Sequence, residues 1–350
     1  MNILIIRVSA IGDVIHTLPA LFLLRHCLPE ARIEWVVQKK AVSLLVGQPF
    51  IDHLWVLPDH FFTPCNLPIT IDTIHALRQT TWDAIIDFQG LLKTSLLLAP
   101  LHGTKYGFDR NHTRESLSSW FTHHHTTPEY NNIIQKNLAL AADVVYDKNG
   151  WRTILPSVQT LQKQFFLYFS PTVHNTVDAW MEQHRIERFI ALCPNTTWPS
   201  KHWPTERWLE LVDYLATTEA TAQTPIVIVG STFGKAAADL ADRATQTNRP
   251  IIELPAWDLL TVAYTLTKAA VVIAPDTGLL HLADYLAIPA IGLFGPTNKD
   301  RHGPFLQPIN RVLTLEADCP HRQQKHHGTT DCMANLAADT VGKQVLKLFT

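Results

Sequence analysis

Residues 271–297 restrict the fold more strongly than any other part of the chain. The apolar, β-branched run at 271–274 predicts a buried strand, and residues 290–294 predict a second one. Asp276 opens a turn into a short helix between them, and the pair Ile288-Pro289 ends that helix. Because the connection is a helical crossover, we expect the two strands to be parallel neighbours in one sheet.

The same alternation of strands and helices runs through both halves of the chain. Further strands are predicted at residues 2–6, 32–37, 53–56, 84–88, 105–108, 189–193, 225–229 and 250–253. Helices are predicted at residues 14–28, 91–98, 130–145, 178–184, 206–217 and 235–245. The 350 residues also exceed the size of one ordinary domain. We therefore predict an α/β protein of two doubly wound domains, residues 1–170 and 171–333, with a final helix at 334–350 that packs back on the first domain.

The charge and composition exclude several classes of protein. The 29 basic residues are balanced by 31 acidic ones, so we expect no nucleic acid partner. A chain with 46% hydrophobic and 17% charged residues suits buried sheets and argues against disorder. No apolar run is long enough to cross a membrane. The five cysteines are odd in number and scattered, and no signal peptide precedes them, so we expect a reduced, cytoplasmic protein.

Familiar cofactor and metal motifs are absent from the sequence. There is no G-x-G-x-x-G, which disfavours a nicotinamide domain. Residues 230–235 resemble a P-loop but are one residue short, and Ala236 replaces the hydroxyl that would bind magnesium. Cys319 and Cys332 lie near three histidines without the spacing typical of a zinc site, so a polar surface loop is the simpler interpretation. These histidines are His321, His326 and His327. We therefore predict no cofactor and no metal.

Two aspartates follow predicted strands at positions that suit ligand binding. Asp13 ends the turn 9–13 directly after Gly12, whose missing side chain lets a ligand approach closely. Asp276 begins the helix of the stretch 271–297, where backbone N–H groups and the helix dipole favour an anion. Helix capping alone would explain either aspartate, so both interpretations stay open.

A third polar stretch, residues 194–204, follows the strand predicted at 189–193. Thr196, Thr197 and Lys201 provide two hydroxyls and a cation at a strand end, which suits a diphosphate. Capping would explain the threonines but not a lysine ahead of Trp203-Pro204. We therefore favour a binding function for this stretch.

Taken together, these motifs resemble the bacterial lipopolysaccharide heptosyltransferases of glycosyltransferase family 9, most closely the heptosyltransferase I branch. The matching segments occur in family order and are residues 9–19, 87–93, 107–108, 114–115, 196–204, 276–282 and 294–297. The resemblance implies a GT-B fold, in which two Rossmann-like domains face each other across a cleft that holds the active site. It also implies inverting, metal-independent transfer of a heptose from ADP-L-glycero-D-manno-heptose. The implied acceptor is the Kdo of Kdo2–lipid A, at the cytoplasmic face of the inner membrane.

The resemblance also implies a role for individual residues. Asp13 matches the catalytic base of the family, and the first domain would bind the acceptor. The implied donor contacts, on the nucleotide-sugar-binding second domain, are Thr196, Thr197, Lys201, Asp276, Thr277, Gly278 and His281. The implied acceptor contacts are Gln89, Lys93 and Arg114. One departure concerns the nucleotide, because the family usually has an acid shortly after the strand 225–229, where this chain has Gly234 or Lys235.

Other functions of the same fold also fit the sequence. A family 9 enzyme with another nucleotide sugar or another acceptor matches every motif nearly as well. A non-catalytic GT-B scaffold would not need Asp13, Lys201 and Asp276 together. A lipid acceptor implies peripheral attachment to the inner-membrane surface through the first domain. The expected contributors to that attachment are Lys93, Lys105, Arg110 and Arg114.

Overall fold

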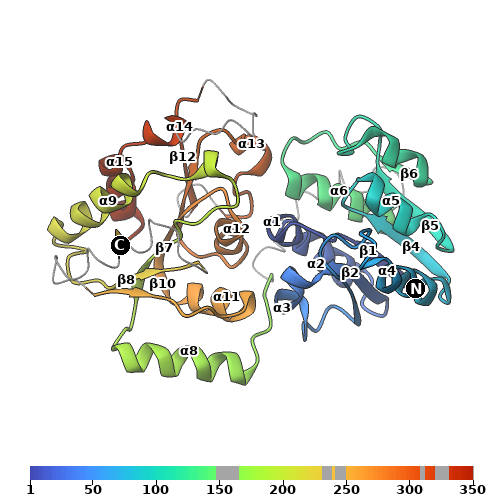
Figure 1. The fold of residues 1–350 in the computed structure, drawn as a ribbon, viewed down its shortest axis with the longest axis horizontal. Coiled ribbons are helices and arrows are strands. Elements are labelled where there is room, and N and C mark those ends of the chain that lie inside the picture. Colours follow the sequence, from blue (N-terminus) through green and yellow to red (C-terminus); the bar gives the residue numbers. More distant parts are fainter. Residues whose placement is uncertain (147–164, 231–238, 241–249, 308–311, 320–330, 350) are drawn as a thin grey trace. The chain divides into compact units, whose positions relative to one another are not determined.

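The chain forms two compact units, residues 1–168 and 169–350 (Figure 1). The structure is a computed structural model, and it describes residues 1–146, 165–230, 239–240, 250–307, 312–319 and 331–349. The observed division lies two residues before the predicted boundary at 170. The helix predicted at 235–245, together with Gly234, Lys235 and the three histidines at 321–327, lies outside the described residues except for positions 239–240.

The first unit is built around a parallel six-stranded sheet with the order β3-β2-β1-β4-β5-β6. Its strands are β1 (Asn2–Ile6), β2 (Arg32–Gln38), β3 (His53–Leu57), β4 (Trp82–Asp87), β5 (Gly103–Phe108) and β6 (His124–Thr126). Its α-helices are α1 (Ile11–Ile15), α2 (Leu18–Cys27), α3 (Val42–Leu45), α4 (Leu67–Arg78), α5 (Leu92–Leu98) and α6 (Ile133–Tyr146). Short 3-10 helices occur at η1 (Lys39–Ala41) and η2 (Ser116–Phe121).

The helix predicted at 14–28 is two helices, α1 and α2. Proline has no N–H group, so Pro19 cannot donate the hydrogen bond to the carbonyl of Ile15 that a continuous helix requires. The chain instead restarts at Thr17, the N-cap of α2, with Pro19 in the first turn. This break separates the polar turn at Asp13 from the buried helix behind it.

The second unit is built around another parallel six-stranded sheet, with the order β12-β11-β10-β7-β8-β9. Its strands are β7 (Phe189–Leu192), β8 (Ile226–Ile228), β9 (Ile251–Glu253), β10 (Ala269–Pro275), β11 (Ala290–Phe294) and β12 (Val312–Glu316). Its helices include η4 (Pro199–Lys201), α8 (Pro171–His184), α9 (Thr205–Thr217), α11 (Leu259–Thr267), α12 (Gly278–Tyr285), α13 (Lys299–His302), α14 (Asp331–Ala334) and α15 (Ala338–Leu348). Strand β10 pairs with β11 in parallel, which confirms the predicted βαβ unit at 271–297.

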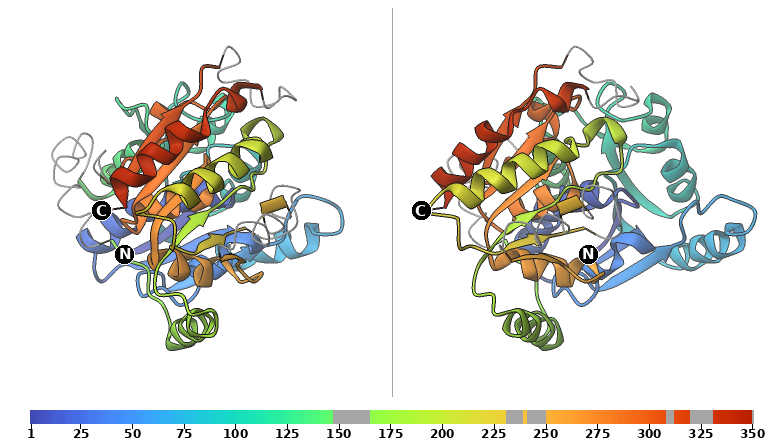
Figure 2. Two further views of the ribbon diagram at one scale, coloured as in Figure 1. Left: turned by 90° about the vertical axis from the view of Figure 1, so that its left-hand side faces the viewer. Right: turned by 60° about the vertical axis from the view of Figure 1, so that its left-hand side comes forward.

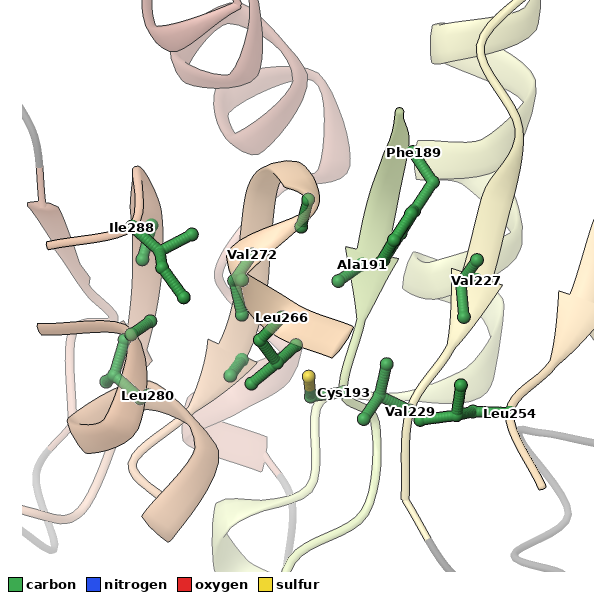
Figure 3. Packing of buried hydrophobic residues seen from close by; sticks show 14 of the residues in the cluster. Phe189, Ala191, Cys193, Val227, Val229, Leu254, Leu266, Val272, Leu280 and Ile288 are labelled. Carbon is green, nitrogen blue, oxygen red and sulfur yellow. The ribbon is translucent and has the colours of Figure 1, made fainter. Parts of the chain in front are cut away.

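Both faces of the second sheet are covered by apolar side chains. On one face, side chains of β7, β8 and β10 pack against Leu266 of α11 and Leu280 of α12 (Figure 3). On the other face, α9 and α15 lie side by side (Figure 2) and contribute Trp208, Val341 and Val345 to the core. Helix α15 therefore belongs to the second unit. This corrects the prediction that the final helix packs back on the first domain, because its apolar side chains are already buried against α9 and the second sheet.

Candidate functional site

Each sheet brings its polar motifs to the point where the strand order reverses. In the first unit, β1 and β4 are neighbours; helix α1, which follows β1, carries Asp13, and the turn after β4 carries Gln89. In the second unit, β7 and β10 are neighbours, and the segments after them carry Lys201 and Asp276. Open α/β sheets bind ligands in the crevice at this point. The strand topology therefore places one candidate site on each unit.

In the first unit, Asp13 forms an ion pair with Arg114. Nη2 of Arg114 lies 2.8 Å from both carboxylate oxygens of Asp13, and the N–H of Ala10 donates to Oδ2 at 3.2 Å. Burial would raise the pKa of Asp13, but the positive charges of Arg7 and Arg114 hold this pKa well below its usual range. Asp13 is thus ionised at neutral pH, as a base must be, and it is already paired.

Arg7 is a buried cation of the candidate site that the sequence analysis did not select. It lies directly after β1 and is completely buried, with Nε donating to Thr17 Oγ1 at 3.2 Å and Nη2 donating to Asn137 Oδ1 at 3.3 Å. Burial lowers the pKa of Arg7 to about 10, so it keeps its charge at neutral pH. The available signal was a single cation inside the apolar run 3–8. Burying an unpaired charge costs free energy, and the nearby carboxylate of Asp13 offsets this cost for Arg7.

Gln89 holds the turn that carries Asp13. It is buried, and its Oε1 accepts the N–H groups of Val8 at 3.1 Å and Ser9 at 3.3 Å. Asp87 in turn accepts the N–H groups of Gln89 at 2.9 Å and Gly90 at 3.1 Å. Burial raises the pKa of Asp87 to about 6. The geometry supports a positioning role for Gln89, and its predicted contact with the acceptor stays a prediction.

The lysines predicted on this unit lie in different environments. Lys93 is exposed, and its Nζ lies 5.7 Å from the centre of the Phe61 ring. Lys105 is buried, and its Nζ donates to the carbonyl of Leu101 at 2.9 Å. The expected contribution of Lys105 to a membrane-facing surface is therefore wrong, because its ammonium is used inside the unit.

In the second unit, the structure brings together Lys201, Asp276 and His281. Nζ of Lys201 lies 2.7 Å from Oδ2 of Asp276 and 3.2 Å from the Asp276 carbonyl oxygen. Nε2 of His281 lies 3.2 Å from the other carboxylate oxygen, Oδ1. Burial would raise the pKa of Asp276, but His281 and Lys201 hold this pKa far below its usual range. This pairing was not predicted, since the residues are 75 positions apart.

The start of α12 adds neutral donors to this cluster. Thr277 is the N-cap of α12, yet its side chain makes no capping bond. Within the described residues its Oγ1 is buried without a hydrogen-bond partner. Gly278 is the first helical residue, so the unpaired N–H groups of the helix start lie here. A cation, a hydroxyl and a helix N-terminus together suit an anion such as a phosphate.

The predicted threonines of the segment after β7 are less deeply placed. Thr196 is half-buried, and its Oγ1 donates to the carbonyl of Trp198 at 2.7 Å. Thr197 is exposed. Asn195, just before them, is half-buried and its Nδ2 has no hydrogen-bond partner within the described part of the chain. The roles of Thr196 and Thr197 toward a donor stay predictions.

The cysteines and the membrane prediction can also be compared with the structure. Cys319 and Cys332 form a disulfide, which corrects the expectation that all five cysteines are reduced. Cys27, Cys65 and Cys193 are free.

Over the residues with described positions, no helix combines the length and apolar character that a membrane crossing requires.

Comparison with known proteins identifies the family. Residues 71–331 match the model of glycosyltransferase family 9 (heptosyltransferase). Lipopolysaccharide heptosyltransferase 1 of Escherichia coli K12 is 30% identical over 315 residues, which cover 87% of this chain and 91% of that protein. The enzyme of the same name from Pseudomonas aeruginosa is 27% identical, over 87% of this chain and 81% of that protein.

Solved structures agree on the fold. E. coli heptosyltransferase WaaC with ADP has a TM-score of 0.76 and 22% identity, over 99% of this chain and all of that chain. E. coli ADP-heptose lipopolysaccharide heptosyltransferase II has a TM-score of 0.77 and 19% identity, over the whole of this chain and 98% of that one. The two parallel sheets and these matches identify a GT-B type fold. The chain therefore belongs to glycosyltransferase family 9, the heptosyltransferase family, and is a glycosyltransferase.

Proposed function

We propose that this enzyme transfers a heptose from ADP-L-glycero-D-manno-heptose to the Kdo of Kdo2–lipid A, in the synthesis of the lipopolysaccharide inner core. The observation that carries the proposal is the cluster of Lys201, Asp276 and His281 at the start of α12. The relatives named lipopolysaccharide heptosyltransferase 1 support the choice of sugar and acceptor.

The donor diphosphate would bind at the start of α12. Lys201, the hydroxyl of Thr277 and the N–H groups at Gly278 supply positive charge and hydrogen-bond donors for it. The Asp276 carboxylate would repel a phosphate, so its role is to hold Lys201 and His281 in place. Because the lysine and the helix N-terminus stabilise the charge that grows on departing ADP, we propose that transfer needs no metal ion.

The acceptor hydroxyl would lose its proton to Asp13. Its oxygen forms the new bond to the anomeric carbon while the bond from that carbon to the diphosphate oxygen breaks, and the electron pair leaves with ADP. Attack on the face opposite ADP inverts the anomeric configuration. Asp13 is the ionised carboxylate that the first unit provides at the end of β1.

A lipid acceptor requires the enzyme to approach a membrane surface. The first unit exposes large apolar side chains on α4, α5 and η2, among them Ile71, Leu96 and Trp120. Trp120 is 74% exposed. Lys93 and Arg110 are exposed cations of the same unit. We propose that these side chains attach the enzyme peripherally to the cytoplasmic face of the inner membrane.

The direct test is release of ADP from ADP-heptose with and without Kdo2–lipid A, in the presence and absence of EDTA. We expect release that depends on the acceptor and survives chelation. Turnover only with another nucleotide sugar or acceptor would indicate a different family 9 activity, and no turnover with any of them would favour a scaffold. Activity lost in EDTA and restored by magnesium or manganese would contradict metal independence.

A further inference from the structure

The proposed base, Asp13, is occupied by an ion pair. Both of its carboxylate oxygens lie 2.8 Å from Nη2 of Arg114, and the Asp13 side chain is only 13% exposed. Lone pairs that accept from Arg114 are not available to an acceptor hydroxyl. A carboxylate stabilised in this way is also a weaker base, because proton transfer to it has less driving force. In this arrangement the base is masked.

Arg114 is the partner that can move. Its backbone is fixed, because the next residue, Glu115, donates its N–H to the Gly90 carbonyl at 3.0 Å and accepts the Leu92 N–H on Oε2 at 2.6 Å. The Arg114 side chain is 33% exposed. Its only hydrogen bonds within the described residues are those to Asp13. A guanidinium on a long, flexible stem can therefore turn toward a ligand while its loop stays in place.

The other charges around Asp13 are fixed. Arg7 is completely buried and bonded to Thr17 and Asn137, so it cannot follow a ligand. His16, the C-cap of α1, is also buried and adds to the positive potential at Asp13. Asp87 at the end of β4 interacts electrostatically with Arg7. When Arg114 leaves, Arg7 still favours the ionised form of Asp13.

We propose that Arg114 is a switch that masks Asp13 until an anionic group of the acceptor draws the guanidinium away. This inference rests on the proposed function. A carboxylate or phosphate of the acceptor competes for the same planar N–H donors that hold Asp13, since both form charge-assisted bonds with arginine. The freed carboxylate then takes the hydroxyl proton as the acceptor oxygen bonds to the anomeric carbon and ADP leaves with the electron pair. Water carries no anionic group, so it meets a masked base, and the donor is protected from hydrolysis.

The test compares acceptors of different charge on the wild-type enzyme and the Arg114→Gln variant. The acceptors are O-deacylated Kdo2–lipid A, the same molecule with its Kdo carboxyl groups methylated, and the same molecule without its phosphates. For the wild type, we expect one of the two neutralised acceptors to lose on the order of 10²-fold in kcat, the lower end of what positioned proton transfer contributes. If kcat falls with the methylated acceptor, the anionic group is the carboxylate; if it falls with the acceptor that lacks phosphates, the anionic group is the phosphate. For Arg114→Gln, we expect the kcat values for all three acceptors to agree within roughly threefold, because the base is never masked.

A second measurement checks the same inference without an acceptor. Arg114→Gln should hydrolyse ADP-heptose faster than the wild type, because its Asp13 is free to activate water. The matched control is Arg78→Gln, which removes the same charge from an exposed arginine at the end of α4 and should behave like the wild type. Circular dichroism of each variant verifies the fold.

Four outcomes would overturn the inference. If neutralised acceptors change only KM, Arg114 merely binds the anion. If Arg114→Gln keeps the wild-type ratio of kcat values, or hydrolyses ADP-heptose no faster than the wild type, Asp13 is not masked. If the wild type transfers heptose to none of the acceptors, the proposed function itself fails and this inference falls with it.

Discussion

At the scale of single residues, the charged side chains of both sites are paired before any ligand arrives. Asp13 is paired with Arg114, and Lys201 with Asp276. Pairing fixes the position of a side chain, and a site that is already positioned loses less conformational entropy when it binds. Because of this pairing, a ligand competes with the ion-pair partner within the protein for each charged side chain.

Replacing Asp13 tests the base. Asp13→Asn keeps the size of the side chain and an oxygen that can accept the Ala10 N–H, but it cannot take a proton. We expect kcat to fall by roughly 10²–10⁴-fold, with donor affinity unchanged, measured by ADP release and by titration calorimetry with ADP. Asp72→Asn, at an exposed position on α4, is the matched control. A folded Asp13→Asn enzyme with normal kcat, when chemistry limits the rate, would show that another group is the base.

Replacing Lys201 tests the charge at the diphosphate. Lys201→Ala removes a cation that is needed most as ADP departs, so we expect a higher donor KM together with a kcat lower by roughly 10²-fold. Lys343→Ala removes an exposed lysine from α15 of the same unit and should have no effect. If Lys201→Ala leaves kcat unchanged, the lysine contributes only to binding of the ground state.

At the scale of secondary structure elements, sequence patterns predicted the central strands and two of the four edge strands, β3 and β9, but missed β6 and β12. Strands β1 and β11 coincide with the predicted ranges 2–6 and 290–294. Strands β4 and β10 overlap the predicted ranges 84–88 and 271–274, but each begins two residues earlier. The sequence of β6 (His124–Thr126) is His-His-Thr, which has no apolar run, whereas β12 is a short Val-Leu-Thr-Leu-Glu segment with one buried residue. Both are edge strands paired on one side only, so pairing with the sheet contributes to their formation beyond the local sequence.

The contact between α9 and α15 can be tested at Gly342. A methyl group at this position would lie too close to the Tyr214 ring of α9. Gly342→Ala gains about 1 kcal/mol of helix propensity but overpacks the interface, which typically costs about 1–3 kcal/mol. We expect a net loss in the free energy of unfolding, measured by urea denaturation, whereas Lys347→Ala at the exposed end of α15 should change little. A more stable Gly342→Ala protein would show that the two helices can separate at no cost.

The raised pKa of Asp87, the last residue of β4, can be tested by the pH dependence of protein stability. The pKa of Asp87 is raised from 3.8 to about 6, so the folded state holds its proton more tightly than the unfolded state. The stability that this proton provides is present below about pH 4 and is lost as the pH rises through 6, a change of about 3 kcal/mol. Asp87→Asn has no such proton. We therefore expect the free energy of unfolding of Asp87→Asn to increase relative to wild type between pH 4 and pH 7, and an equal pH dependence of both proteins would contradict the raised pKa.

At the scale of the whole molecule, candidate site residues could be selected from the sequence, but the pairing between them could not be predicted. Strand ends followed by Gly-Asp or Asp-Thr-Gly identified Asp13 and Asp276 as candidates. Arg114 is 101 positions from Asp13 and belongs to a loop whose place depends on Gly90 and Glu115. Local sequence carries no information about such a pairing, because the tertiary structure creates it.

Peripheral attachment is the prediction for the whole enzyme. Apolar and cationic side chains of the first unit should bind vesicles that contain anionic lipids, and high salt should weaken this binding by screening the cations. Trp120→Ser removes the most exposed large apolar side chain among the described residues and should also weaken this binding, measured by vesicle sedimentation. Binding that only detergent reverses would indicate another kind of attachment.

The separate hydrophobic cores of the two units have a consequence for evolution. One cluster of buried side chains belongs to residues before Tyr168, and two others belong to residues after it. Recombination between two family genes at this junction would leave every one of these clusters intact. Under the proposed division of roles, such a crossover exchanges the acceptor-recognising half and keeps the nucleotide-sugar half. Under the same proposal, exchange of one gene segment would change the acceptor of the enzyme before any point mutation alters a binding site.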